Sequence, residues 1–83
     1  DKDDQKQRLI RQTRYMTAST YVEAKKIDKA ADILKQLIKE DPDNPTYPND
    51  LGFIWCDNDM NLEESEKLIR TALELDCLLY TSD

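Results

Sequence analysis

The feature that most constrains this chain is a helical pattern that occurs twice. Residues 50–76 predict two short amphipathic helices joined by a tight turn, and residues 15–41 carry a looser version of the same pattern. The helices are expected over about residues 9–25, 28–40, 48–57 and 62–76. Because the first linker is only two or three residues long, the first two helices should form an antiparallel hairpin.

Composition agrees with an all-α fold. Of the 83 residues, 36% are charged and one is Gly, whereas a β-rich fold needs more turn residues and more β-branched side chains. The net charge of −6 argues against nucleic acid as a partner, since nucleic-acid binding needs a basic face. No apolar run approaches the ~20 residues of a membrane span, so no membrane association is expected.

The cellular compartment is the least constrained property. The polar N-terminus shows no signal-peptide pattern, which makes the cytoplasm the expected compartment. The chain does not begin with Met, however, so an upstream segment stays open.

The expected helix ends depend on a few capping residues. Asp28 is expected to cap the second helix by accepting a backbone N–H bond, and Pro42 to end that helix. Pro48 fits the first position of the third helix, where its missing N–H costs no intrahelical bond. Asn61 and Glu64 approximate a capping box at the start of the fourth helix.

The two halves align residue by residue. Ala18 pairs with Gly52, and Tyr21 with Trp55, at an offset of 34 residues. Later pairs lie 35 apart, which one extra residue in the second hairpin turn would explain. Gly inside a helix costs about 1 kcal/mol relative to Ala, so Gly52 predicts a close helix contact. The expected packing positions are Ala18, Tyr21, Ala30, Leu34, Leu37, Leu51, Gly52, Trp55, Ser65, Ile69 and Ala72.

Helical hairpins of this length with small–aromatic–small spacing are similar to tetratricopeptide repeats, or TPRs. The residues that carry the resemblance are Ala18, Tyr21, Ala30, Pro42, Leu51, Gly52, Trp55, Ala72 and the Glu63-Glu64-Ser65 segment. The chain departs from the family pattern at Arg14, Thr17, Pro48, Ser65 and Cys77. The resemblance covers about residues 11–76 and implies hairpins stacked as an α–α superhelix, with repeat one at 11–44 and repeat two at 45–76, within a longer array.

The resemblance also implies a function. In TPR proteins the first helix of each repeat lines a groove that holds a peptide or protein segment, which implies an interaction or scaffold module rather than an enzyme. The corresponding partner-binding positions are Gln12, Tyr15, Ser19, Glu23, Asn49, Phe53 and Asp57. Phe53 lies off the apolar stripe of its helix and should be exposed, either as an interface residue or as a contact to a neighbouring repeat. The basic carboxylate clamp of some TPR proteins is absent, since its positions hold Tyr15, Ser19 and Asp50.

No catalytic, cofactor or metal site is expected. The chain has no His, which excludes His-based triads and His-ligated metals. Residues 57–61 resemble the start of a calcium loop, but Leu62 and Leu68 occupy the places of its essential Gly and Glu. Cys56 and Cys77 lie 21 positions apart, and buried thiols are expected rather than a disulfide.

The ends of the chain leave alternatives open. Residues 1–10 fit a polar extension or the end of a preceding repeat, and residues 77–83 break the repeat pattern. That tail resembles a translated sequencing adapter, and the alternative is a native apolar terminus that covers the last groove.

Three architectures remain open at this point. The first is a two-repeat piece of a helical solenoid. Its apolar end faces would be uncovered, so marginal stability or self-association through these ends is expected. The alternatives are an accessory segment of a larger enzyme, and a free-standing four-helix bundle in which the first helix packs against the fourth.

Overall fold

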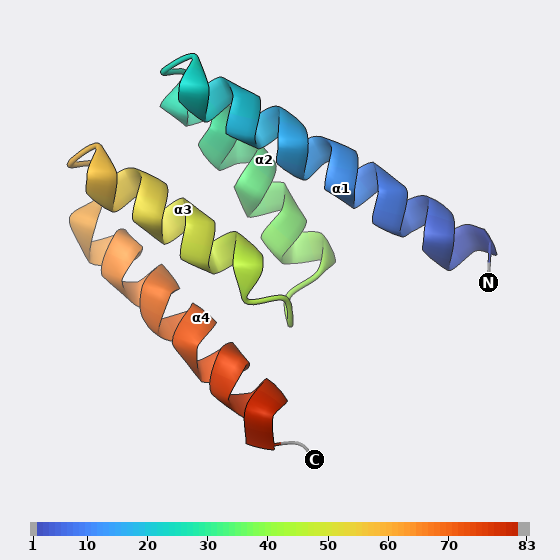
Figure 1. The fold of residues 1–83 in the computed structure, drawn as a ribbon. Coiled ribbons are helices and arrows are strands. Elements are labelled where there is room, and N and C mark those ends of the chain that lie inside the picture. Colours follow the sequence, from blue (N-terminus) through green and yellow to red (C-terminus); the bar gives the residue numbers. More distant parts are fainter. Residues whose placement is uncertain (1, 82–83) are drawn as a thin grey trace.

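The fold is a series of four α-helices, and residues 2–81, which the computed structural model describes, contain no strand. Of residues 78–81 only the backbone is described. The helices are α1 (Lys2–Glu23), α2 (Ile27–Glu40), α3 (Thr46–Asp57) and α4 (Leu62–Thr81). Helices α1 and α2 form one antiparallel hairpin and α3 and α4 form a second, which lies beside the first (Figure 1). The expected all-α class is confirmed.

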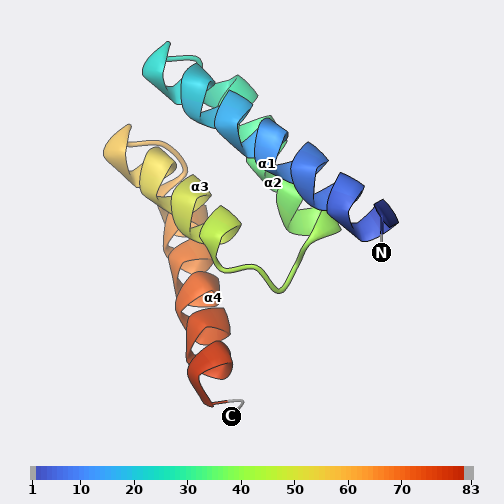
Figure 2. The ribbon, with the colours of Figure 1, turned by 45° about the vertical axis from the view of Figure 1, so that its right-hand side comes forward.

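The two hairpins form an open arrangement. Each helix packs mainly against its neighbours in the chain, and the described parts of α1 and α4 make no substantial contact. Figure 1 shows α1 and α4 at opposite ends of the series of helices, and in Figure 2 the C-terminal half of α4 runs away from the other three helices. The radius of gyration is 13.3 Å, against about 12 Å for a globular domain of this length. A closed four-helix bundle is therefore excluded.

The core lies where the hairpins meet, and leucines and small residues fill it. Leu34 and Leu37 of α2 and Leu51 of α3 are almost completely buried. Their burial contributes about 1.5–3 kcal/mol each relative to exposure. Of the expected packing positions, Tyr21 and Ile69 are half-buried and the other nine are buried.

Gly52 has the close helix contact that its position predicts. A Cβ on this residue would lie 2.8 Å from Cγ1 of Ile69 and 2.9 Å from the backbone oxygen of Ser65. Both distances are too short for a real Cβ, so only glycine lets α3 and α4 approach this closely.

Both hairpins close with the same turn. After α1, Lys26 N–H donates to Tyr21 O (2.8 Å) and Lys25 N–H donates to Val22 O (3.0 Å). This is the Schellman pattern, in which the residue after the helix cap has a positive φ. Lys25 accordingly has φ 64°.

After α3 the pattern recurs 34 residues later. Met60 N–H donates to Trp55 O (2.8 Å), Asp59 N–H donates to Cys56 O (3.2 Å), and Asp59 has φ 54°. The first turn covers residues 24–26 and the second covers 58–61. The second turn therefore holds the extra residue that changes the repeat offset from 34 to 35.

Helices α1 and α4 extend well beyond the expected bounds. Helix α1 begins at Lys2 rather than near residue 9, because residues 2–8 contain no helix breaker and Asp3 and Asp4 suit the positive end of the helix dipole. Helix α4 continues to Thr81 rather than ending near residue 76, since no Gly or Pro follows Asp76. Residues 82–83 of the expected tail lie outside the described residues.

The expected capping residues are wrong in three places, although α4 begins at Leu62 as predicted. Helix α3 starts at Thr46, so Pro48 is its third residue; the first four N–H groups of a helix have no intrahelical partner, and proline is therefore tolerated there. Lys26 rather than Asp28 is the N-cap of α2, and it makes no side-chain cap bond. Asn61 has φ 45°, unlike the extended backbone of a capping-box residue.

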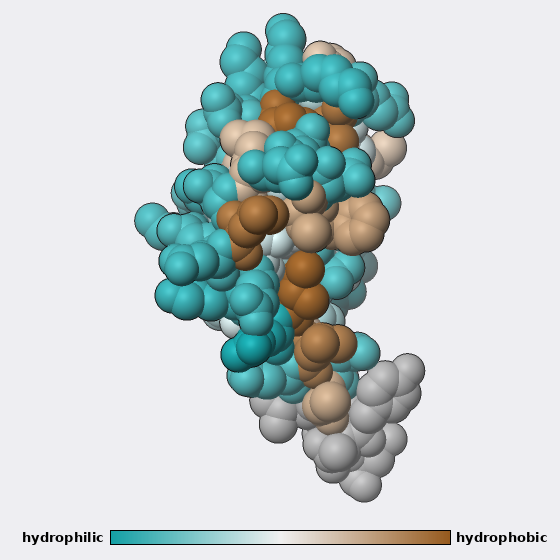
Figure 3. Space-filling model, turned by 90° about the vertical axis from the view of Figure 1, so that its left-hand side faces the viewer, coloured by the Kyte–Doolittle hydropathy of each residue, from teal (hydrophilic) through white to brown (hydrophobic). Residues whose placement is uncertain are grey.

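Several large apolar side chains stay in solvent. Figure 3 shows one face on which hydrophobic side chains form a broken stripe between hydrophilic flanks, running toward the C-terminal end. The exposed large hydrophobic residues are Leu9, Ile10, Met16, Phe53, Leu62 and Leu73. An apolar stripe such as the one in Figure 3 is typical of interaction sites.

Candidate functional site

Tyr15 connects the first helices of the two hairpins. Its hydroxyl donates a hydrogen bond to the Asp50 carboxylate of α3, and its ring centroid lies 5.9 Å from that of Tyr47, tilted by 51°. Tilted ring pairs at this distance are favourable beyond the area that they bury. Tyr15 is half-buried, and its hydroxyl is already hydrogen-bonded within the chain.

The same contact changes the acidity of the phenol. The hydrogen bond to Asp50, with burial and the nearby negative charge, raises the pKa of Tyr15 to about 12. Burial also raises the pKa of Tyr47. Because both phenols stay protonated near neutral pH, Tyr15 remains a hydrogen-bond donor and keeps α1 beside α3.

A depression of about 280 Å³ lies between α1 and α3 on one side of this contact. Its lining residues are Ser19, Val22, Glu23, Asp50, Phe53 and Ile54. The structure thus brings together Ser19, Glu23 and Phe53, three of the expected partner-binding residues. Phe53 is 66% exposed, as its position in the sequence predicts. The depression combines an aromatic side chain in solvent with two carboxylates.

A second depression, of about 350 Å³, lies on the other side of Tyr15. Its lining residues are Arg8, Arg11, Gln12, Tyr15, Asp41, Asn44, Thr46 and Tyr47. Gln12 and Tyr15 are expected partner-binding residues, whereas Asn49 and Asp57 are exposed and line neither depression. The seven positions therefore form no single continuous pocket.

Arginines of α1 attach its N-terminal half to the end of α2. Arg14 Nη1 donates to Glu40 Oε2 at 2.6 Å, and Arg11 Nε lies 3.9 Å from Asp41 Oδ2. Hydrogen bonds from Gln36 and then Arg14 lower the pKa of Glu40. Arg14 and Glu40 are exposed, whereas Arg11 and Asp41 are half-buried. Both pairs act mainly in orienting the two helices.

The largest of these depressions lies elsewhere, between α2 and α4, and the sequence patterns do not point to it. Its volume is about 450 Å³, and Leu51 and Trp55 of α3 lie at its base. Lys35, which the helical pattern simply places in water, has its Nζ 5.2 Å from the Trp55 ring centroid. One sequence pattern could have indicated this depression, because apolar residues adjoin lysines on both helices: Lys35 and Lys39 flank Ile38 on α2, and Lys67 precedes Leu68 on α4.

The described residues offer little other chemistry. They contain no group of three or more His, Cys, Asp or Glu side chains placed to hold a metal ion. No helix in the described part of the chain has the length and apolar character needed to cross a membrane. Cys56 and Cys77 are both exposed, so the expectation of buried thiols is wrong. The apolar face of α3 is occupied by Leu51 and Trp55, and Cys56 lies outside it.

Comparison of the chain with family models, curated proteins and solved structures finds no match.

Proposed function

We propose that this chain is a TPR-type module for protein–protein interaction, with its two hairpins stacked as successive repeats of a superhelix. The support is the equivalence of the hairpins. Ala18 and Gly52 are both buried, as are Ala30 and Ser65. The turn after each first helix has the same hydrogen-bond pattern at an offset of 34 residues, which is the TPR period.

The ligand of the module is a peptide or protein segment that lies along α1 and α3. The observation that carries this function is Phe53, which is 66% exposed at the edge of the depression between those helices. Exposed aromatic residues in partly enclosed surfaces dominate the energetics of many interfaces. Glu23 and Asp50 line the same depression, so it favours a segment in which an apolar residue adjoins Lys or Arg.

The module needs no cofactor or metal, and its partner is not nucleic acid. The net charge of −6 would repel a phosphate backbone. Nothing in the arrangement of the described side chains favours catalysis, so the role is that of a scaffold or adaptor.

Selection from a random peptide library tests the proposal. The selected peptides would be titrated against the wild-type chain, Phe53→Ala, and Leu73→Ala as a control, since Leu73 is 60% exposed on α4. Truncating a central aromatic residue should weaken binding at least tenfold, whereas the control should bind as the wild type does. Selected peptides that carry Lys or Arg beside an apolar residue and bind Phe53→Ala with unchanged affinity would contradict the proposed site.

A further inference from the structure

The depression between α2 and α4 has an apolar floor. Leu51 and Trp55, both buried residues of α3, form its base, and the half-buried Ile38 and Leu68 form its sides. Its volume of about 450 Å³ is within the range of ligand pockets. It is large enough to take one or two large apolar side chains.

The rim of this depression is cationic. Lys35 and Lys39 lie one helical turn apart on α2, Lys67 faces them from α4, and Glu64 is the single carboxylate. Among the described residues no ion pair neutralises the three ammonium groups. A local excess of two positive charges thus surrounds an apolar floor in a chain whose net charge is −6.

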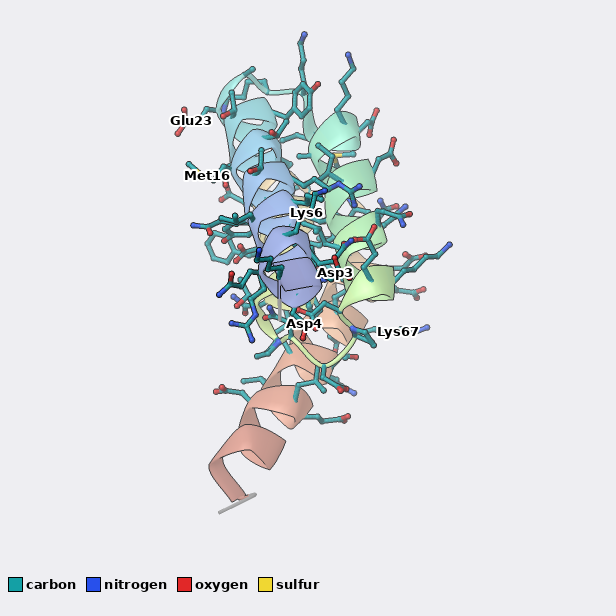
Figure 4. All side chains as sticks on the ribbon, turned by 90° about the vertical axis from the view of Figure 1, so that its right-hand side faces the viewer. Asp3, Asp4, Lys6, Met16, Glu23 and Lys67 are labelled. Carbon is teal, nitrogen blue, oxygen red and sulfur yellow. The ribbon has the colours of Figure 1, made fainter. Side chains whose placement is uncertain are left out.

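This depression is separate from the one between α1 and α3. In Figure 4, Glu23 projects from one side of the molecule and Lys67 from the other. The charges also differ, since Glu23 and Asp50 line the α1/α3 depression and lysines surround the α2/α4 depression. The two depressions therefore differ in the sign of the charge that lines them.

We propose that the α2/α4 depression binds an acidic peptide segment in which a large apolar residue is flanked by Asp or Glu. The apolar residue leaves water against Ile38, Trp55 and Leu68, and the flanking carboxylates pair with Lys35, Lys39 and Lys67. The lysine stems add apolar contact while their ammonium groups stay at the rim. Because the floor is apolar, a purely charged polyanion gains only the electrostatic part of the binding free energy.

Trp55 provides the reporter, since it is the single Trp of the chain and lies at the base of the site. Its fluorescence would be titrated with an acetylated and amidated Glu-Glu-Leu-Phe-Glu-Glu peptide at low salt. The controls are Lys-Lys-Leu-Phe-Lys-Lys and Glu-Glu-Ser-Ser-Glu-Glu. The acidic apolar peptide should bind at least tenfold more tightly than either control, and its affinity should fall as the salt concentration rises. Equal binding of the Ser-containing peptide, or tighter binding of a dT oligonucleotide, would overturn the proposal.

Charge reversal locates the binding site. Lys35→Glu combined with Lys67→Glu should lower the affinity for the acidic peptide at least tenfold, because two attractive charge pairs become repulsive. Lys6→Glu combined with Lys26→Glu changes the net charge equally at exposed positions outside the depression and should change the affinity less than twofold. Circular dichroism checks that both variants fold. Equal losses in the two double variants, or no binding to the wild-type chain, would refute the site.

Phe53→Ala separates this site from the proposed function. The acidic peptide should bind this variant as it binds the wild type, because Phe53 does not line the α2/α4 depression. A loss of acidic-peptide binding in Phe53→Ala would place the peptide on α1 and α3 and overturn the second site.

Discussion

The Ser65 hydroxyl donates a buried 2.6 Å hydrogen bond to the carbonyl oxygen of Gly52. The backbones of the same pair also lie close together, since the Ser65 backbone oxygen lies 2.9 Å from the position of a Cβ on Gly52. Ser65 is the counterpart of Ala30 in the first hairpin, and both residues are buried. The hydroxyl therefore adds a polar bond across the helix pair without taking more room than the contact allows.

Gly52→Ala should destabilise the second hairpin. The new methyl group would overlap Ser65 O and Ile69 Cγ1, and overpacking of this kind costs about 1–3 kcal/mol. The gain in helix propensity, about 1 kcal/mol, offsets part of that cost. Urea unfolding followed by circular dichroism measures the difference. A urea midpoint equal to or above that of the wild type would show that α3 and α4 leave room for a Cβ at position 52.

Ser65→Ala should cost about 0.5–1.5 kcal/mol, the net contribution of one hydrogen bond. The matched control is Ser19→Ala on α1, an exposed serine whose hydroxyl donates to Tyr15 O at 3.3 Å. That variant should be neutral or slightly stabilising, because Ala is the better helix former. The same urea experiment compares the two. Equal effects would mean that the buried bond contributes nothing beyond the local helical one.

Glycine should stabilise both hairpin turns. Lys25 has φ 64° and Asp59 has φ 54°, a conformation that costs a residue with a Cβ roughly 1–2 kcal/mol. Lys25→Gly and Asp59→Gly remove that cost. Part of the gain is offset because glycine raises the conformational entropy of the unfolded chain. We expect a net gain of about 0.5–1 kcal/mol each. Lys26→Gly, at φ −97°, has no such strain to relieve and should not raise the melting temperature.

Tyr15→Phe should change how stability depends on pH. The pKa of Tyr15 is raised from 10.0 to about 12 in the fold, so the folded state holds this proton more tightly than the unfolded chain. The contribution is complete below pH 10 and is lost as pH rises toward 12. The variant should therefore lose less stability than the wild type between these pH values. Asp50→Asn removes the charge but keeps an acceptor, and should lower the pKa of Tyr15 in a tyrosinate absorbance titration.

These residues alone should be marginally stable or self-associate. Leu62 is 55% exposed and Leu73 is 60% exposed on α4, and a repeat module normally covers such a face with its neighbour. A thermal melt should have a midpoint below ~60 °C, or one that rises with protein concentration. In the second case Leu62→Lys with Leu73→Lys should remove the concentration dependence. A sharp, concentration-independent transition well above 60 °C would contradict this.

Much of the fold follows from local patterns. Apolar spacing predicts four helices, and Gly52 predicts a close contact that is found. The errors lie at helix ends, where the signals are weak: Pro48 fits either the first or the third helical position, and Asp28 lies only two residues from the true cap, Lys26. Lys25, Asp59 and Asn61 have left-handed backbone conformations in the turns, and because none of them is a glycine the sequence did not indicate this.

The side chains that line the surface depressions are less predictable. The exposure of Phe53 follows from its own helix, because the Leu51–Ile54–Trp55 stripe leaves it on the outer side. Tyr15 and Asp50 lie 35 residues apart in the sequence, and neither residue type specifies the other as its partner.

The local sequence thus established the helices, their apolar faces and the repeat length, because backbone hydrogen bonding and side-chain periodicity act within a few turns. Tertiary packing established which surfaces meet: the Tyr15–Asp50 bond between α1 and α3, and the lysine-rimmed depression between α2 and α4. These depend on the angle and separation of whole hairpins, which close contacts such as that of Gly52 with Ser65 set.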